Sequence, residues 1–468
     1  MNILILGSGG REHAIARSLR SDDDVLYIAP GNPGMAPLGT LVDLDILDGA
    51  AVAAFARSKG IDLVVVGPEA PLVAGVADAV REAGIDVFGP SREAARLEGS
   101  KAFAKEVMAS AGVQTARSRL CTSLGEVEAA LDAFGAPHVV KDDGLAAGKG
   151  VVVTDDRDAA LAHAQGCLAK PEGKALIEEF LDGPEVSLFC LCDGRVALPL
   201  EPAQDYKRAY DGGKGPNTGG MGSYSPLPWA DPGLADAVVA EVAQPVVDEM
   251  ARRGTPFVGV LYCGLALTSE GVKVVEFNVR FGDPETQSVL ARLVTPLAGL
   301  LRDAARGELG PVLGEPERAG GESAACRGEP RAEKGRQPSR GGSELNGDER
   351  EAAADDEEKP GSRHGLRRLE WLPDAAVTVV LAASGYPGPV HAGDPVEGLG
   401  AAESVPGAHV VHAGTKESDG AVVSAGGRVL ACVGMGKDVA AARAAAYAAI
   451  SEIRLKGAHF RTDVAAGM

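Results

Sequence analysis

The chain has 468 residues, of which 45% are hydrophobic, and its formal net charge is −20. This length suits about three domains, each large enough to bury an apolar core. The acidic balance argues against nonspecific binding to nucleic acid, because such binding needs a basic surface to neutralise phosphates. No run of about 18 apolar residues occurs and no basic segment precedes the first apolar run, so we expect neither a membrane span nor a signal peptide.

Cysteine usage indicates the compartment. The seven cysteines are scattered along the chain and lack the paired spacing of a metal site. An odd number of unpaired cysteines is typical of reduced thiols, so we expect a cytoplasmic location.

Residues 2–89 alternate between β-branched or aliphatic runs and helical patterns. We expect strands at 2–6, 25–29, 63–66 and 85–88, and helices near 12–19, 50–58 and 71–83. Such alternation predicts a doubly wound parallel sheet, and each strand runs into a Gly/Pro turn. Because ligands bind at the carboxyl ends of such strands, residues 1–100 are predicted to form a substrate-binding α/β domain.

The first of these turns, Gly7-Ser8-Gly9-Gly10-Arg11-Glu12, opens a helix. A dinucleotide fingerprint would need glycine where Glu12 stands, which disfavours NAD. A glycine turn at a helix start suits a single phosphate, and Arg11 can add a charge-assisted hydrogen bond. The alternative is a tight turn whose Arg11 is solvated or packed.

A second helix start is predicted at Glu98-Gly99-Ser100-Lys101, with Ser100 as the N-cap. Lys101 in a first turn opposes the helix dipole. It therefore indicates an anion shared at this end, unless it pairs with Glu98.

The stretch from His138 to Val153 carries the strongest signal. Two valine-rich runs flank a turn that contains Gly144, Gly148 and Gly150, with Lys141 before it and Lys149 within it. This predicts a glycine-rich hairpin whose backbone N–H groups and lysines bind a polyphosphate. It is not a Walker A loop, because the glycine spacing, the residue after the lysine and the following strand all differ.

Two segments after the hairpin also contain polar candidates. Residues 175–188 indicate strand, turn and strand, with Glu178 and Glu179 at the first strand's end. Residues 205–222 form a long polar loop in which Lys207, Arg208 and Asn217 favour contact with an anionic ligand over disorder.

The segment Val272 to Glu285 predicts a metal site. Strand alternation places Glu276, Asn278 and Arg280 on one face. A carboxylate and an amide oxygen suit Mg²⁺ that accompanies nucleotide phosphates, and Arg280 can meet transferred charge. The alternative is the wet face of an edge strand.

Residues 315–365 contain a single leucine, Leu345, no other large aliphatic residue and no aromatic residue, so we expect a disordered insertion. Patterned sequence resumes afterwards, and residues 366–468 predict a small α+β domain.

Several longer motifs together resemble the phosphoribosylamine–glycine ligases, a family of the ATP-grasp superfamily. They are GSGGREHA at 7–14, VGPEAPL at 66–72, GSKAF at 99–103, KDDGLAAGKGV from Lys141, GPNTGGMG from Gly215 and EFNVRFGDPETQ at 276–287. HAGT at 412–415 and GGRVL at 426–430 resemble the C-terminal domain of that family. The resemblance covers nearly the whole chain apart from residues 315–365.

The resemblance implies an α/β fold whose α+β ATP-grasp core spans 101–314, with a lid at about 115–187. The implied reaction joins glycine to 5-phosphoribosylamine at the expense of ATP, giving glycinamide ribonucleotide, ADP and phosphate through glycyl phosphate, in purine biosynthesis. Another carboxylate–amine ligase of purine synthesis and a nucleotide sensor without turnover are the alternatives. We expect a monomer whose partners are these small molecules rather than nucleic acid or membrane.

The resemblance also implies roles for individual residues. ATP would contact Lys101, Lys141, Gly144, Gly148, Lys149, Gly150, Glu178, Glu179, Leu181 and Glu185. The substrates would contact Gly9, Gly10, Arg11, Asn32, Glu69, Asn217, Thr218, Gly219, Gly220 and Met221. Asp205, Lys207 and Arg280 would be catalytic, and Glu276 and Asn278 would hold Mg²⁺ or Mn²⁺.

Two departures from the family pattern concern charge. Asp142 follows Lys141 where a small residue is usual, although strand alternation points its carboxylate away from the lysine. The acid that many ATP-grasp enzymes carry on the preceding strand is absent around Gly264 to Leu267, so phosphate oxygens and water would have to complete the metal shell.

Overall fold

The computed structural model describes residues 1–144, 150–310 and 368–468. The predicted ligand residues Gly148 and Lys149 and the predicted disordered insertion at 315–365 lie outside the described residues. None of the helices within the described ranges is both long and apolar enough to cross a membrane.

The N-terminal sheet is parallel throughout and has the order β3-β2-β1-β4-β5. Its strands are β1 (Asn2–Gly7), β2 (Val25–Pro30), β3 (Thr40–Leu41), β4 (Leu63–Val66) and β5 (Asp86–Phe88). The helices are α1 (Gly10–Leu19), the 3-10 turn η1 (Pro33–Met35), α2 (Gly49–Lys59), α3 (Glu69–Ala74) and α4 (Val76–Glu82). Along β1, Ile3 and Ile5 enter one hydrophobic core and Leu4 and Leu6 enter another, so both faces of the sheet are covered. The predicted doubly wound sheet is confirmed.

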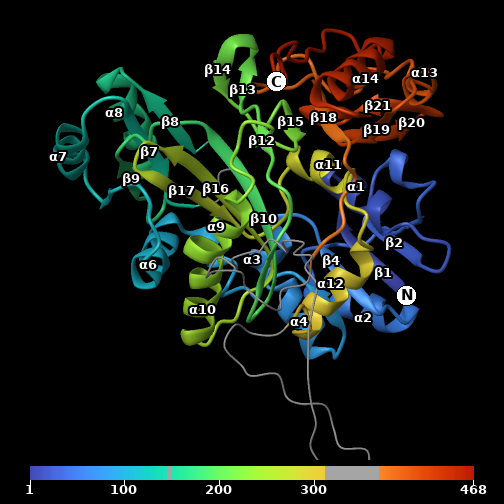
Figure 1. The fold of residues 1–468 in the computed structure, drawn as a ribbon, viewed down its shortest axis with the longest axis horizontal. Coiled ribbons are helices and arrows are strands. Elements are labelled where there is room, and N and C mark those ends of the chain that lie inside the picture. The colour runs from blue at the N-terminus through green and yellow to red at the C-terminus, as the bar shows by residue number, and fades with distance from the viewer. Residues whose placement is uncertain (145–149, 311–367) are drawn as a thin grey trace, which may run out of the picture. The chain divides into compact units, whose positions relative to one another are not determined.

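A second sheet has the order β6-β9-β7-β8 and carries the glycine-rich hairpin. Two helices precede it in the chain, α5 (Arg96–Gly99) and α6 (Lys101–Ala111). Its strands are β6 (Ser118–Cys121), β7 (His138–Asp142), β8 (Val151–Thr154) and β9 (Ala175–Glu178), and the helices α7 (Leu124–Phe134) and α8 (Arg157–Leu168) connect them. Helices α7 and α8 lie beside this sheet (Figure 1), and the small core between them includes Val127, Leu131, Val140 and Ile177. Strands β7 and β8 pair antiparallel with Lys141 opposite Val151, as the sequence predicts.

A third sheet, antiparallel, has the order β11-β10-β16-β17. Its strands are β10 (Glu185–Asp193), β11 (Ala197–Pro199), β16 (Val258–Thr268) and β17 (Gly271–Asn278). Accompanying helices are α9 (Leu234–Val238), the π-helical turn η3 (Val239–Ala243), α10 (Gln244–Arg252), α11 (Glu285–Leu290) and α12 (Leu297–Arg306). A backbone contact joins this sheet to the segment that precedes β6 of the hairpin sheet, since the Val274 amide donates to the Gln114 carbonyl at 2.9 Å.

The C-terminal sheet has the order β12-β15-β18-β22-β19, and its strands β12 and β15 lie at the two ends of the segment 205–222, which the sequence predicts as a long loop. Its strands are β12 (Gln204–Asp205), β15 (Gly222–Ser225), β18 (Ala375–Ala382), β19 (Ala408–His412) and β22 (Arg428–Gly436). Two hairpins, β13 (Arg208–Tyr210) with β14 (Lys214–Asn217) and β20 (Thr415–Ser418) with β21 (Ala421–Ser424), accompany the 3-10 turn η2 (Asp211–Gly213) and the helices α13 (Leu399–Glu403) and α14 (Val439–Glu452).

Strand β15 went unrecognised because its sequence is polar. Its serines are nevertheless buried, with Ser223 donating to the Pro284 carbonyl at 2.8 Å and Ser225 donating to the Pro202 carbonyl at 2.9 Å. A hydroxyl that finds a carbonyl can enter a core without leaving an unpaired donor.

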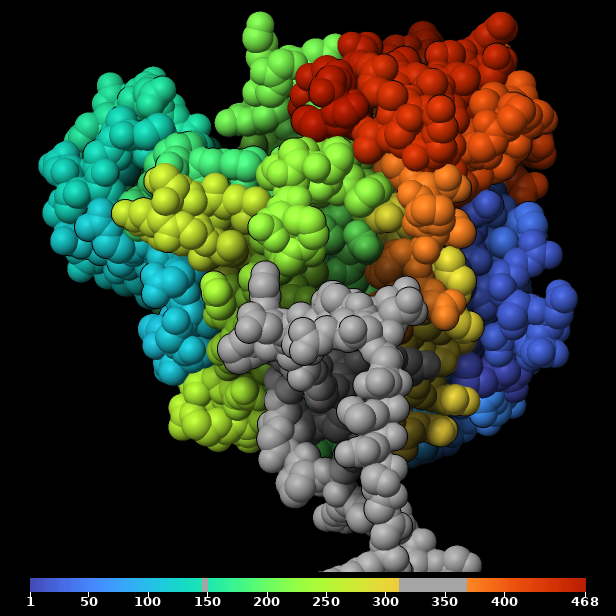
Figure 2. Space-filling view, viewed as in Figure 1, coloured from blue at the N-terminus to red at the C-terminus, as the bar shows by residue number. Residues whose placement is uncertain are grey.

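Histidines fill the contact between α1 and β19. The His412 amide donates to Nδ1 of His13 at 2.9 Å, and the two rings lie 5.9 Å apart. Figure 2 shows the surrounding C-terminal residues, in orange and red, beside the N-terminal residues in blue. Burial, assisted by His412 and Arg17, lowers the pKa of His13 to about 3. Burial, assisted by Arg17, lowers the pKa of His409 to about 3, and burial lowers the pKa of His412 to about 4.

These histidines should make the fold sensitive to acid. Their folded pKa values lie below the unfolded value of about 6.5, so below pH 6.5 the unfolded chain binds more protons and stability falls. Replacing His409 with Gln should therefore reduce the loss of unfolding free energy between pH 7.5 and pH 5.5 by on the order of 1 kcal/mol. Urea denaturation at both pH values measures this. The exposed His391, replaced by Gln, is the matched control, and equal losses in both variants would contradict the assignment.

Candidate functional site

Helix α6 begins as predicted, and its start contacts the hairpin. Oγ of Ser100 accepts from the Phe103 amide at 3.2 Å, which confirms the N-cap. Nζ of Lys101 donates to the Gly144 carbonyl at 3.0 Å, and Asp143 accepts from the Ala102 amide at 3.1 Å. A hairpin carboxylate thus lies at the positive end of the helix. Lys101 does not take Glu98 as its partner, because Glu98 bonds to Arg280 and to the Val279 amide.

A buried network of two lysines and one glutamate lies where α6, β7 and β9 meet. Glu178 is 2.7 Å from Nζ of Lys105 and 2.6 Å from Nζ of Lys141, and its side chain is only 3% exposed. Lys141 also donates to the Val275 carbonyl at 2.9 Å. Lys105 donates to Oγ1 of Thr115 at 2.8 Å and to the Ala116 carbonyl at 2.7 Å. The two lysines and the glutamate together bury a net charge of +1.

The other predicted nucleotide residues differ in their surroundings. Glu179 lies partly exposed and pairs with Arg117, whereas Leu181 follows β9 and is partly exposed. Gly150 is buried beside the hairpin and its carbonyl lies 3.3 Å from Nε2 of His163. The Asp142 carboxylate pairs with Lys170, on the side of the strand away from the Lys141 network. The departure at Asp142 therefore leaves the lysine network intact.

Asp205 and Lys207 lie in a strongly charged region with Glu185, which pairs with Lys207. Removal from water raises the pKa of Asp205 to about 7, Lys207 opposes that rise, and the nearby Glu285, Glu185 and Glu276 add to it. Removal from water works against the charge of Lys207, yet Glu185 and Asp205 outweigh it and hold the pKa of Lys207 well above its usual value.

Glu285 supports this region from inside the core. Its buried carboxylate accepts from the Tyr262 hydroxyl at 2.7 Å and from the Ser187 hydroxyl at 3.2 Å. Those two hydroxyls also lie 2.8 Å apart, and because each has one proton, two of the three contacts can be hydrogen bonds at any one time. Such contacts fix the position of a buried charge before any ligand arrives.

Arg280 follows β17 and connects the predicted metal residues to the N-terminal part. Its guanidinium donates to Glu98 at 2.9 Å and to Oδ1 of Asn278 at 3.2 Å, and lies 3.4 Å from Glu69. Its Nε is buried and has no hydrogen-bond partner among the described residues. Burial opposes its charge, but Glu98 and Glu69 raise its pKa further.

The donor set of Glu276 and Asn278 suits a hard divalent cation that brings its own oxygen ligands. In the ranges that the structure describes, no group of three His, Cys, Asp or Glu side chains is arranged to hold a metal. Gly264 on β16 stands opposite Glu276, so this position has no second carboxylate, as the sequence indicates. Mg²⁺ commonly takes one or two protein oxygens and completes its octahedron with phosphates and water, so these residues fit that ion.

The Gly9–Arg11 turn is packed rather than solvated. The Gly9 amide donates to Glu12 at 2.7 Å, the Arg11 amide donates to Asp283 at 3.2 Å, and the Arg11 guanidinium donates to Glu12 and to the Phe281 carbonyl. A Cβ on Gly10 would lie 2.8 Å from Nε2 of Gln287. Two carboxylates thus occupy the Gly9 and Arg11 amides that the sequence predicts for a phosphate, and the hydrogen bonds of Arg11 match the packed alternative.

Asn32 and the substrate loop connect to the C-terminal part. Nδ2 of Asn32 donates to the Ser8 carbonyl at 2.9 Å and to the His412 carbonyl at 3.0 Å. Thr218 donates to the Lys207 carbonyl at 2.9 Å and accepts from the Gly220 amide at 3.0 Å. Met221 is fully buried, and Asn217 pairs with Arg208 across β13 and β14.

Arg428, from the GGRVL motif, holds this loop against the turn after Arg280. Its Nη1 donates to the carbonyls of Gly219 and Asp283, each at 2.6 Å, and lies 3.4 Å from the Asp283 carboxylate. The Asp283 carboxylate also accepts from the Arg11 amide and from Gln287. One side chain of β22 thereby ties the 217–221 loop to the residues that contact α1.

Sequence reasoning missed several side chains of this site: Glu98, Lys105, Tyr262, Asp283, Glu285 and Arg428. Asp283 and Glu285 lay inside a quoted motif without a role, and Lys105 follows Lys101 by one helical turn, a spacing that places both on one face. Tyr262 stands opposite Asn278 in the β16–β17 register, a pairing that no local pattern predicts.

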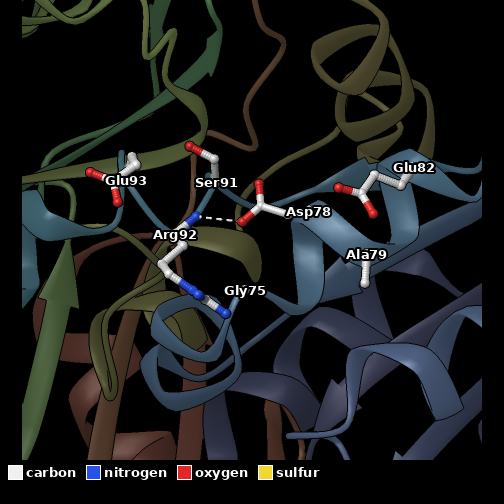
Figure 3. A pocket seen from close by; sticks show the side chains of 7 residues that line it. All are labelled: Gly75, Asp78, Ala79, Glu82, Ser91, Arg92 and Glu93. Carbon is white, nitrogen blue, oxygen red and sulfur yellow. Dashed lines mark hydrogen bonds between the residues drawn. The ribbon is translucent and has the colours of Figure 1, made fainter.

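A cavity of about 480 Å³ lies elsewhere, beside α4 and the segment after β5 (Figure 3). Its polar lining is mainly acidic, with Asp78, Glu82 and Glu93. The Arg92 guanidinium donates to the Ala74 carbonyl at 2.6 Å and the Arg92 amide donates to Asp78 at 2.8 Å. The cavity shares no residue with the predicted site, and its acidic lining does not suit a phosphate.

Comparison with known structures identifies the fold as that of the ATP-grasp enzymes. A crystal structure of phosphoribosylamine–glycine ligase from Thermotoga maritima matches 99% of this chain and 100% of its own, with a TM-score of 0.75 at 29% identity. The biotin carboxylase domain of the Hydrogenobacter thermophilus 2-oxoglutarate carboxylase, solved with MgADP, ADP and bicarbonate, shares the fold at a TM-score of 0.64 and 14% identity, over 98% of this chain and 91% of its own.

Family models for phosphoribosylglycinamide synthetase match in three parts: the N domain at residues 1–98, the ATP-grasp (A) domain at 99–286 and the C domain at 376–467. The protein named phosphoribosylamine–glycine ligase in Streptomyces coelicolor is 57% identical over 100% of this chain and 99% of its own. Its counterpart in Leifsonia xyli is 50% identical over 100% of both chains. The chain belongs to the phosphoribosylglycinamide synthetase family, which confirms the resemblance.

The Arg428 contacts predict a cost for a side chain at Gly219. A Cβ there would lie 2.9 Å from Cζ of Arg428, so Gly219→Ala should displace the guanidinium and lose hydrogen bonds worth on the order of 1 to 2 kcal/mol of stability. Gly125→Ala, on an exposed helix position with open space around it, is the control and should not destabilise. Chemical denaturation compares them. An undiminished free energy of unfolding in Gly219→Ala would show that Arg428 adds nothing there.

Proposed function

We propose that this chain catalyses the ATP-dependent ligation of glycine to 5-phosphoribosylamine, which gives glycinamide ribonucleotide, ADP and phosphate. The family membership supports the reaction, and one observation supports the place of ATP. The Lys105–Glu178–Lys141 network buries a surplus positive charge next to the glycine-rich hairpin. A buried surplus charge is costly unless an anion offsets it, and a nucleotide polyphosphate provides that anion.

The chemistry divides into two displacements. The glycine carboxylate oxygen attacks the γ-phosphorus of ATP, the bond to the bridging oxygen breaks and ADP leaves, which gives glycyl phosphate. The amine of phosphoribosylamine then attacks the carbonyl carbon, loses a proton and expels phosphate. The substrates provide both nucleophiles, so the protein contributes position and charge.

The described side chains divide these tasks. Lys101 and Lys141 would hold phosphates, Arg280 would meet the transferred phosphoryl group, and Lys207, which pairs with Glu185, would face the reaction site together with Asp205. The buried Nε of Arg280 lies 3.4 Å from Glu69 and makes no hydrogen bond to the described residues, so it would donate to a substrate oxygen while Glu98 and Asn278 hold the guanidinium in place. Preorganised donors of this kind stabilise developing charge without reorganising during the reaction.

Glu276 and Asn278 would hold the cation that accompanies ATP, Mg²⁺ or Mn²⁺. When bound, such an ion neutralises phosphate charge as the γ-phosphoryl group transfers. The N-terminal turn, Asn32 and the 217–221 loop would surround phosphoribosylamine, since Arg428 and Asp283 bring them together.

Phosphate release tests the reaction. With purified protein and ATP, release should need glycine and phosphoribosylamine together, and omission of either should reduce it to background. Release with another carboxylate and amine pair in their place would favour a different ligase, and ATP binding without release under any combination would favour a sensor.

Replacing Glu276 with Gln should raise the Mg²⁺ concentration needed for half-maximal activity. The change keeps the shape of the side chain but removes the formal charge that a hard cation prefers. Titration of activity with Mg²⁺ measures the shift, and Glu270→Gln, at an exposed carboxylate beside the same strand, is the control. Superimposable titrations for parent and Glu276→Gln would place the metal elsewhere.

Arg11→Ala should raise the apparent KM for phosphoribosylamine and leave those for ATP and glycine nearly unchanged. Loss of the guanidinium would leave Glu12 buried without its partner and release the Phe281 carbonyl, which would loosen the turn nearest that substrate. Steady-state kinetics with each substrate varied in turn separates the effects. An equal rise in the KM for ATP would assign the N-terminal turn to the nucleotide instead.

A further inference from the structure

Lys105 is a buried cation of the network with Glu178 and Lys141, and the motifs assign it no role. It follows Lys101 by one turn of α6, and its side chain is 14% exposed. Its three partners are Glu178 at 2.7 Å, Oγ1 of Thr115 at 2.8 Å and the Ala116 carbonyl at 2.7 Å. Lys105 thus makes two hydrogen bonds, to Thr115 and Ala116, and an ion pair with Glu178, whose Oε1 has no hydrogen-bond partner among the described residues, so the contact with Glu178 is one of charge.

Lys141 has a different set of partners. It pairs with the other carboxylate oxygen of Glu178 at 2.6 Å and donates to the Val275 carbonyl at 2.9 Å, which leaves one donor of its ammonium group. A phosphate that binds Lys141 must compete with Glu178 for its charge. If Lys141 were the sole partner of Glu178, that competition would leave a carboxylate uncompensated in a site only 3% exposed.

We propose that Lys105 is a positioning residue, the permanent counter-ion of Glu178, which frees Lys141 to bind the phosphates of the nucleotide. The inference rests on the proposed function, because it takes Lys141 as a phosphate ligand. Lys105 keeps Glu178 compensated while Lys141 shifts its charge toward the ligand. The two lysines thus have separate tasks although they share one carboxylate.

A double-mutant cycle on Lys105 and Glu178 tests this inference by calorimetric binding of ATP, ADP and adenosine. Lys105→Met should weaken ATP and ADP binding about tenfold, because Lys141 is then retained by Glu178. Adenosine has no phosphate, so its affinity should change less than about twofold. In a Glu178→Gln background the carboxylate charge is gone, and adding Lys105→Met should change ATP affinity by less than about threefold.

A purely structural role gives different results. If Lys105 only anchors Thr115 and Ala116, Lys105→Met would weaken ATP binding equally in both backgrounds and weaken adenosine binding as well, and either result overturns the inference. Lys105→Arg keeps the charge and should bind ATP within about threefold of the parent. A loss as large as that of Lys105→Met would also overturn it. Thermal melting identifies a variant that does not fold, in which case Lys105→Gln takes its place in the cycle.

Lys141→Met separates this inference from the proposed function. Weak ATP binding in Lys141→Met together with normal binding in Lys105→Met refutes the role of Lys105 and leaves the phosphate assignment standing. Normal ATP binding in Lys141→Met refutes the phosphate assignment itself.

Discussion

The turn from Val279 to Asp283 is the constraint on which the rest of the site depends. Its carbonyls, amide and carboxylate bond to Arg11 from α1, to Glu98 from α5 and to Arg428 from β22. Three segments that are far apart in the sequence are therefore fixed against one short stretch of backbone. Arg280 itself lies inside this turn, so the contacts that join these segments also hold the side chain that would meet the transferred phosphoryl group.

Charge balance explains how the site is prepared for ATP. The chain is strongly acidic as a whole, yet Lys105 and Lys141 bury more positive than negative charge beside the hairpin. Around Asp205 negative charge is in excess, because Glu185, Glu276 and Glu285 act on it together with a single cation, Lys207, among its strongest electrostatic neighbours. A polyphosphate suits the first region and a cation or an ammonium group suits the second. In the proposed function, the two regions would therefore divide the recognition of the substrates by charge.

Patterns of local sequence predicted much of the fold. The alternation of strands and helices in residues 2–89, the Ser100 cap and the β7–β8 hairpin are encoded by spacings of a few residues, and the structure confirms each. Strand β15 was missed because its buried serines resemble loop residues until their carbonyl partners are known. The ion pairs of Glu98 with Arg280 and of Lys105 with Glu178 depend on which helix and strand faces meet in three dimensions. Sequence periodicity alone does not specify how those faces pack.

In the proposed reaction, the charged groups of this site activate the glycine carboxylate by phosphoryl transfer. Glycine with heavy oxygen in its carboxylate tests this most directly, when turned over with ATP and phosphoribosylamine. Mass spectrometry of the inorganic phosphate should find one heavy oxygen atom transferred in each turnover, because the carboxylate oxygen that attacks phosphorus leaves with the phosphate. Phosphate without heavy oxygen, formed together with the ligated product, would contradict the account.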